Sequence, residues 1–186
     1  MPYANIEELR ESLAADPQSH DGQWLELIAQ FHIDDDSESL QELRRDGIET
    51  MDLLFDDFRM GRGASERVLV ARMIGRMSDV QVRDYALGVH SEDTFDIYFT
   101  MWRELLRLAP HGYVAPIACI VAAMSYESGD GALAQKALDR AFGDDESYPL
   151  AGLLRRVFNA GWPPESFAQM RRELHPKVID AIFEGH

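Results

Sequence analysis

The sequence predicts an all-α protein of stacked antiparallel helical hairpins, arranged as a helical bundle or a short solenoid. Three observations support this prediction. Apolar residues recur at helical spacing through most of the 186 residues. Glycine and proline turns divide the chain into periodic segments of about 10 to 17 residues, which is typical of helical hairpins. No alternating run of β-branched residues bounded by a hairpin turn occurs, so no strand is expected.

The first two elements are predicted to be short helices. Asn5, with Glu8 three residues further on, forms a capping-box pattern that begins a helix, and Pro17 marks the limit of that helix. The second helix follows the Asp21–Gly22 turn, and its apolar side chains recur at helical spacing. These side chains are Trp24, Leu27, Ile28 and Phe31.

Residues 38–60 are predicted to form one helix, or a pair of helices broken near Gly47. Ser37 is the predicted N-cap of this segment. It follows the acidic run Asp34–Asp36, and negative charge stabilises the positive end of a helix dipole.

The main boundary in the chain is predicted at Gly61–Gly63. It separates an acidic N-terminal part, residues 1–60, from a helical-hairpin core, residues 61–186, and we expect the two to pack as one compact domain. The formal charge of −15 is unevenly spread, because residues 1–60 hold 16 acidic and 4 basic side chains, a net of −12. A field of this sign repels nucleic acids and anionic membranes and attracts basic surfaces.

The core part begins with three predicted helices. Apolar residues mark a helix over residues 68–77, and Ser78 is the predicted cap of the next one, which Gly88 ends in a left-handed conformation. Glu92–Leu108 is the clearest amphipathic helix in the chain. Residues Pro116–Tyr126 are apolar nearly all round, which predicts a helix at the centre of the core.

The last predicted elements follow the turn at Gly129–Gly131. A return helix ends at Gly143, and a further helix runs from about Ser147 to Asn159. Pro163 and Pro164 are expected in the first turn of another element, because proline is tolerated there. A short separate helix is predicted over residues 178–183.

One hairpin resembles a tetratricopeptide repeat in irregular form. It shows the order small, aromatic, Gly, Ala, large and Ala that such repeats use to pack two helices closely. The matching residues are Ala123, Tyr126, Gly129, Ala134, Leu138 and Ala141. The resemblance implies a tetratricopeptide-like arrangement of stacked hairpins.

A longer stretch, residues 115–165, resembles the C-terminal helical region of an actinobacterial family catalogued as domain of unknown function 4192. The matching features are the small-residue helix that ends in SGDGALA, the ALDRAF helix and the LAGLLRRVFNAG helix. With the upstream helices, the resemblance covers about residues 65–173. It implies a fold and no catalytic residue. Longer members have an α/β N-terminal portion, whereas residues 1–60 here have the pattern of acidic helices.

The titratable residues give no indication of catalysis or of a metal or other cofactor. None of the six histidines forms the i, i+4 pair of a helical zinc site. Cys119 lies in an apolar run, which predicts a buried, unreactive thiol, and a lone cysteine is typical of a reducing compartment. The N-terminus lacks a signal-peptide pattern, and no apolar run approaches the ~18 residues of a membrane span. We therefore expect a cytoplasmic protein that is not an enzyme.

Binding of a protein or peptide partner in a groove between hairpins is the leading functional prediction. Trp102, Tyr126 and Trp162 are the candidate aromatic anchors, because aromatic residues dominate binding hot spots. The basic candidates that would line the groove are Arg155, Arg156, Arg171 and Arg172. The alternative is an acidic protein that mimics nucleic acid toward a basic partner, and a third possibility is a small-molecule pocket. The sequence leaves the partner and the oligomeric state open.

Overall fold

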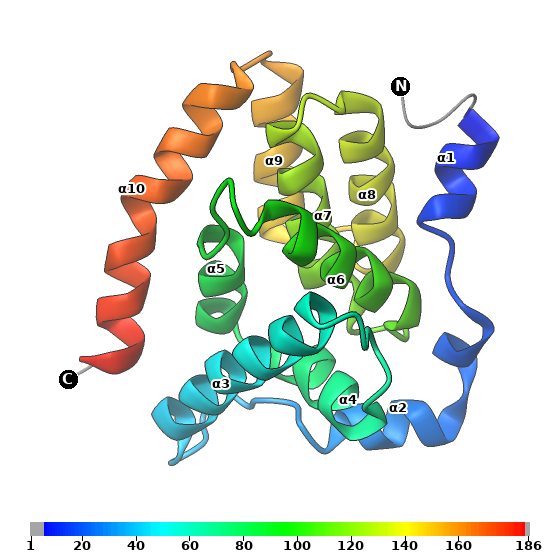
Figure 1. Ribbon diagram of the computed structural model, residues 1–186, viewed down its shortest axis with the longest axis vertical. Coiled ribbons are helices and arrows are strands. Elements are labelled where there is room, and N and C mark those ends of the chain that lie inside the picture. The colour runs from blue at the N-terminus through cyan, green and yellow to red at the C-terminus, as the bar shows by residue number, and fades with distance from the viewer. Residues whose placement is uncertain (1–5, 185–186) are drawn as a thin grey trace.

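The prediction of an all-α fold is confirmed. A computed structural model of the protein describes residues 6–184, and these contain α-helices, one short 3-10 helix and no strand (Figure 1). In chain order the elements are α1 (Ile6–Ser12), η1 (Pro17–His20), α2 (Gly22–Ala29), α3 (Leu40–Arg59), α4 (Arg67–Arg76), α5 (Val80–Gly88), α6 (Phe95–Leu108), α7 (Val114–Glu127), α8 (Gly131–Asp144), α9 (Pro149–Asn159) and α10 (Pro164–Phe183).

Helix α7 lies at the centre of the molecule, as its uniformly apolar sequence predicts (Figure 1). Every residue from Val114 to Ser125 is buried, and complete burial of each large aliphatic side chain contributes about 1.5–3 kcal/mol. Helix α8 returns alongside α7 after a turn in which Gly129 has a φ of 84°, a conformation that favours glycine. Small residues of α8 on the buried side, Ala134, Ala137 and Ala141, permit the close approach of the two helices.

The acidic N-terminal part and the remainder of the chain share one core. Trp24 and Met51 are buried in the same cluster of side chains as Trp102. The Trp24 indole Nε1 also donates a hydrogen bond of 2.8 Å to the carbonyl of Leu108, at the end of α6. The Gly61–Gly63 loop is therefore a turn within one packed unit.

The long helix α3 is continuous through Gly47, where a break was an open alternative. A Cβ atom at Gly47 would lie 3.0 Å from the side chain of Val82, so the glycine permits close contact with α5. The predicted cap at Ser37 is wrong, because α3 begins two residues later with Ser39 at the N-cap position. The Ser37 hydroxyl instead accepts a bond from the Ser39 amide in the preceding turn. Asn5, the predicted cap of α1, lies outside the described residues.

Two predictions about the ends of α5 are also wrong, namely its N-cap residue and the left-handed conformation of Gly88. Asp79, not Ser78, is the N-cap, and its carboxylate accepts bonds from the amides of Gln81 and Val82. The Ser78 hydroxyl accepts a bond of 3.0 Å from the Ile33 amide. Gly88 does end α5, but its φ is not positive, and its lack of a side chain serves contact with α10 instead.

The C-terminal helix α10 is a single helix of 20 residues, so the two separate elements predicted there are wrong. Pro176 lies inside it and removes one backbone hydrogen bond. Both Pro176 and Arg172, whose carbonyl loses that bond, are exposed, so water can satisfy the carbonyl. Gly161, with a φ of 70°, ends the preceding α9. Helices α9 and α10 then diverge from the turn that joins them, and α10 follows one edge of the molecule (Figure 1).

Candidate functional site

The space between α9, α10 and α5 forms an open groove with a volume of about 480 Å³. Each helix contributes side chains at helical spacing, so three continuous faces surround the groove. The apolar lining consists of Leu87 from α5, Leu150, Leu153, Leu154 and Val157 from α9, and Phe167, Met170, Leu174, Val178 and Ala181 from α10. A concave, mostly apolar site of this size is typical of a binding pocket.

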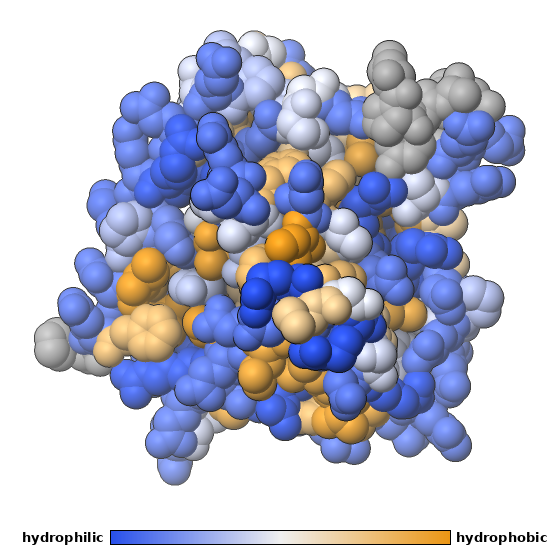
Figure 2. Space-filling model, viewed as in Figure 1, coloured by the Kyte–Doolittle hydropathy of each residue, from blue (hydrophilic) through white to orange (hydrophobic). Residues whose placement is uncertain are grey.

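Two leucines of the groove are half exposed. The exposed fraction of Leu153 is 48% and that of Leu174 is 49%, whereas Leu154, next to Leu153, is buried. Figure 2 shows hydrophobic residues at the surface near the C-terminal half of α10, and others over the centre and the lower part of the same face. Burial of such side chains by a partner would be favourable, because apolar area removed from water contributes roughly 25 cal/mol per Å².

An aromatic cluster lies near the turn between α9 and α10, and one of its members, Phe167, lines the groove. The ring of Tyr126 stacks on Phe158 with a centroid distance of 4.1 Å, and the ring of Phe167 packs edge-on against both. The Tyr126 hydroxyl also donates a hydrogen bond to the carbonyl of Trp162 in the turn. These contacts fix the position from which the two helices diverge.

Charged residues lie at the opposite end of the groove. The guanidinium of Arg83 is 2.7 Å from the carboxylate of Asp84, and it donates a bond of 3.1 Å to the Tyr148 hydroxyl before α9. Lys177 is exposed on the last turns of α10. The apolar walls therefore end in a polar rim that includes two cations.

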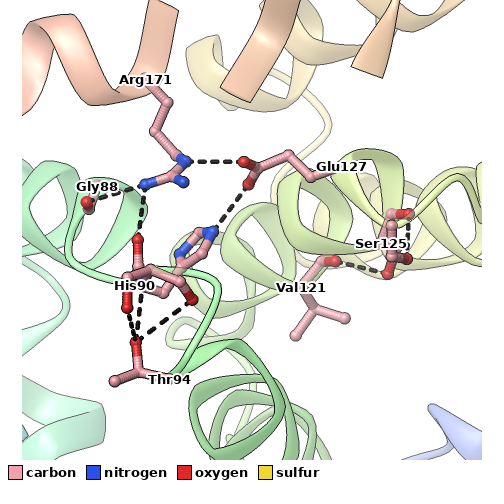
Figure 3. A network of polar contacts seen from close by, with 9 residues as sticks. Gly88, His90, Thr94, Val121, Ser125, Glu127 and Arg171 are labelled. Carbon is pink, nitrogen blue, oxygen red and sulfur yellow. Dashed lines mark hydrogen bonds and ion pairs between the residues drawn. The ribbon is translucent and has the colours of Figure 1, made fainter. Parts of the chain in front are cut away.

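A buried ion-pair network holds α10 against the rest of the molecule (Figure 3). The Arg171 guanidinium is 2.9 Å from the carboxylate of Glu127 at the end of α7 and also donates bonds to the carbonyls of Gly88 and His90. The second oxygen of Glu127 is 2.9 Å from Nε2 of His90. Removal of one partner from a buried pair of this kind is strongly destabilising, because the remaining charge would be buried without a partner.

His175 completes the contact between α10 and α5. Its ring packs against Tyr85 with a centroid distance of 5.0 Å, and it lies directly over Gly88. Burial lowers the pKa of His175 below its usual value, and the nearby charges of Arg171 and His90 lower it further. His175 therefore favours its neutral form in the folded protein.

Comparison with protein families gives a match over most of the chain, up to the start of α10. A family model described as domain of unknown function (DUF4192) matches residues 1–165. The chain belongs to this family. Searches of curated proteins and of solved structures found no match. The DUF4192 match begins earlier in the chain than the resemblance found from the sequence, which covered about residues 65–173. The acidic residues 1–60, which were interpreted as a departure from the family, therefore lie within the matched region.

The predicted aromatic anchors of this DUF4192 protein fall in different environments. Trp102 is buried in the core, so its assignment as a partner anchor is corrected to a packing role. Tyr126 belongs to the aromatic cluster near the turn between α9 and α10 and is not part of the groove lining. Trp162 has an exposed fraction of 41% and lies in the turn above that cluster, so it is accessible there.

The four arginines that were predicted to line the groove also lie in different environments. Arg171 lines the groove, as expected, but its charge is engaged by Glu127. Arg155 faces α8, where it pairs with Asp139 at 2.9 Å, and this contact takes it away from the groove. Arg156 is exposed on α9, outside the groove lining, and Arg172 lines a neighbouring hollow beside His90.

The groove residues Leu153, Leu174, Arg83 and Lys177 were not predicted. The leucines occur at helical spacing, which signals an apolar face, but the sequence does not say whether that face is covered. The angle between α9 and α10 decides this, and contacts distant in the sequence fix that angle.

The described residues show few other candidate sites. Within residues 6–184, no group of three or more His, Cys, Asp or Glu is arranged to hold a metal ion, and no helix has the length and apolar character required to cross a bilayer. Cys119 is fully buried, and burial raises the pKa of its thiol to about 12, although the charge of Arg83 opposes this. A raised pKa disfavours the thiolate that a nucleophile requires.

Proposed function

We propose that the protein is a non-enzymatic helical scaffold that binds a peptide segment of a partner protein in the groove between α5, α9 and α10. The observation that carries this proposal is the pair of half-exposed leucines, Leu153 and Leu174, on facing walls of one apolar groove. Helical proteins commonly bind peptide segments in grooves of this kind.

The polar groups around the groove favour binding over chemistry. Arg83 pairs with Asp84, and Arg171 pairs with Glu127, so these charges are already neutralised by the protein. Ion pairs of this kind stabilise the fold and define the shape of the groove. A protein partner also suits the position of α10, which forms one wall of the groove and follows one edge of the molecule (Figure 1).

Selection from a displayed peptide library against the full chain tests the proposal. Enriched peptides are expected to lose at least tenfold in affinity for the double variant Leu153→Gln and Leu174→Gln, because both walls become polar. The matched control is Leu53→Gln on α3, outside the groove, where the exposed fraction of the leucine is 54%. Binding should be unchanged by this control. Failure to enrich any peptide that depends on the groove leucines would overturn the proposal.

A second candidate is an acidic surface that mimics nucleic acid toward a basic partner, as the net charge of −12 in residues 1–60 indicates. Glu49, Asp52 and Asp56 lie at helical spacing on the exposed side of α3. Partial burial raises the pKa of Asp52, and the charges of Asp56 and Glu49 raise it further. Binding through this surface should weaken steeply as salt increases, whereas binding in the apolar groove should change little.

A further inference from the structure

We infer that the segment bound in the groove is an amphipathic α-helix with acidic residues beside its apolar face. This inference rests on the proposed function, since it names the kind of peptide that the same groove would take. Three features support it: the periodicity of the lining, the absence of backbone partners there, and the sign of the charge at the rim.

The lining positions repeat with the period of a helix on all three walls. Helix α9 contributes residues 150, 153, 154 and 157, and α10 contributes positions from 167 to 181 at intervals of three and four. Three helical faces around one open space are the surroundings of a fourth helix in a bundle. The stripe on α10 spans about 21 Å at 1.5 Å per residue, which fits a helix of about four turns.

The backbone of the groove also favours a helical occupant. The walls are helices whose amides and carbonyls bond within each helix, and the described part of the chain has no strand edge that could pair with an extended peptide. An extended peptide would therefore bury amide and carbonyl groups without partners, which is costly. A helix satisfies its own backbone and presents only side chains to the apolar walls.

The charge of the rim selects acidic residues. The lining contains three basic side chains, Arg83, Arg171 and Lys177, and one acidic side chain, Asp84, in a chain that has 33 acidic and 18 basic residues overall. Since Arg171 is engaged by Glu127 and Arg83 by Asp84, Lys177 is the cation of the described lining that has no carboxylate partner, and it is exposed. A carboxylate on the edge of the bound helix would pair with Lys177, whereas the mostly acidic surface elsewhere would repel it.

Four synthetic peptides test this inference on the full chain by isothermal titration calorimetry. The first is an 18-residue helix with leucines at helical spacing and flanking glutamates. The second has lysines in place of the glutamates, the third has a central proline that breaks the helix, and the fourth is a shuffled sequence. The first should bind at least tenfold more tightly than each of the others. Lys177→Glu should reduce the preference for glutamate over lysine by at least fivefold.

The controls separate this inference from the proposed function. Binding of the first peptide should weaken at least tenfold in the double variant Leu153→Gln and Leu174→Gln. In the control Leu53→Gln it should weaken by less than twofold. The circular dichroism spectrum should be the same in all variants. Equal binding of the proline and helical peptides, still dependent on the groove leucines, would overturn the helical occupant and leave the proposed function intact. Peptide binding that does not depend on those leucines would overturn both the inference and the proposed function. Self-association of the chain that disappears in Leu174→Gln would instead identify a second copy as the occupant and overturn the inference.

Discussion

Arg171 connects three parts of the molecule through one buried guanidinium. It pairs with Glu127 of α7 and donates bonds to the carbonyls of Gly88 and His90, while its own backbone belongs to α10. Its side chain and that of Glu127 have exposed fractions of only 4% and 7%. Neither charge is solvated by water in the folded state, so each depends on the other.

Replacement of Arg171 by alanine is therefore expected to lower the free energy of unfolding by about 3–5 kcal/mol, because Glu127 would remain buried without its main partner. Urea denaturation followed by circular dichroism measures this change. The control is Arg59→Ala, which removes an exposed ion pair with Asp56 and should cost less than about 1 kcal/mol. A loss for Arg171→Ala as small as that of the control would contradict the role of Arg171 in holding α10.

His175 is expected to make the stability depend on pH. Because its pKa is lower in the folded protein than its usual value near 6.5, the unfolded chain binds the proton first as the pH falls. The free energy of unfolding should decrease from about pH 6.5 downward and level off below the folded pKa. Substitution His175→Gln should reduce this decrease, as measured by urea denaturation at a series of pH values. The same slope in wild type and His175→Gln would show that another group is responsible.

At the scale of elements, the contact between α5 and α10 depends on a glycine. A Cβ atom at Gly88 would lie 2.4 Å from Nδ1 of His175 and 2.9 Å from its Cβ. The backbone of α10 would have to move to relieve this overlap, since the obstructing atoms are close to it. Gly152 in α9 differs, because the nearest atom to an added Cβ is 3.9 Å away, at the end of the Arg156 side chain.

These two glycines predict opposite effects of the same substitution. Gly88→Ala should destabilise the protein by about 1–3 kcal/mol, which is the cost of overpacking. Gly152→Ala should stabilise it by up to about 1 kcal/mol, because alanine is the better helix former. Thermal unfolding of the two variants compares them directly. A Gly88→Ala protein as stable as wild type would mean that α10 shifts at no cost.

The sequence predicted which segments are helical better than where each helix begins and ends. Helices α6 and α7 were evident, since one has a single apolar face and the other is apolar all round. N-caps were misplaced where two suitable residues are close together, as at Ser78 and Asp79, because tertiary contacts decide between them.

The groove was beyond prediction for a physical reason. A separate helix was predicted over residues 178–183, but α10 continues through Pro176 to Phe183. The position of α10 depends on Arg171, which meets Glu127 from 44 residues away in the chain, and on the packing of Phe167 against Tyr126. Pairings over such separations leave no periodic signal in a single sequence. The apolar faces were predictable, and the gap between them was not.

At the scale of the whole molecule, the acidic N-terminal part is bound to the rest by a common core. Ile28 and Leu54 from this part are fully buried in the same cluster as Ile117 and Leu138 from later helices. The two parts therefore bury apolar residues against each other, although they differ strongly in charge. A single cooperative unit is the expected thermodynamic behaviour.

Unfolding of the full chain is therefore expected to follow one transition, with the same midpoint by tryptophan fluorescence and by far-ultraviolet circular dichroism. A fragment of residues 61–186 should bind a hydrophobic dye such as ANS and lack a cooperative transition, because the positions covered by α2 and α3 would be open to water. Two separate transitions in the full chain, or a cooperatively folded fragment, would show that the parts are independent.

The exposed side chain of Trp162 provides a fluorescent reporter at the turn that joins α9 and α10. The protein contains three tryptophans, and the indoles of Trp24 and Trp102 are sealed in the core, while that of Trp162 is 41% accessible beside the turn between α9 and α10. Collisional quenchers in water should thus extinguish mainly the emission of this one fluorophore. The intrinsic spectrum would then register occupation of the neighbouring groove without any attached label.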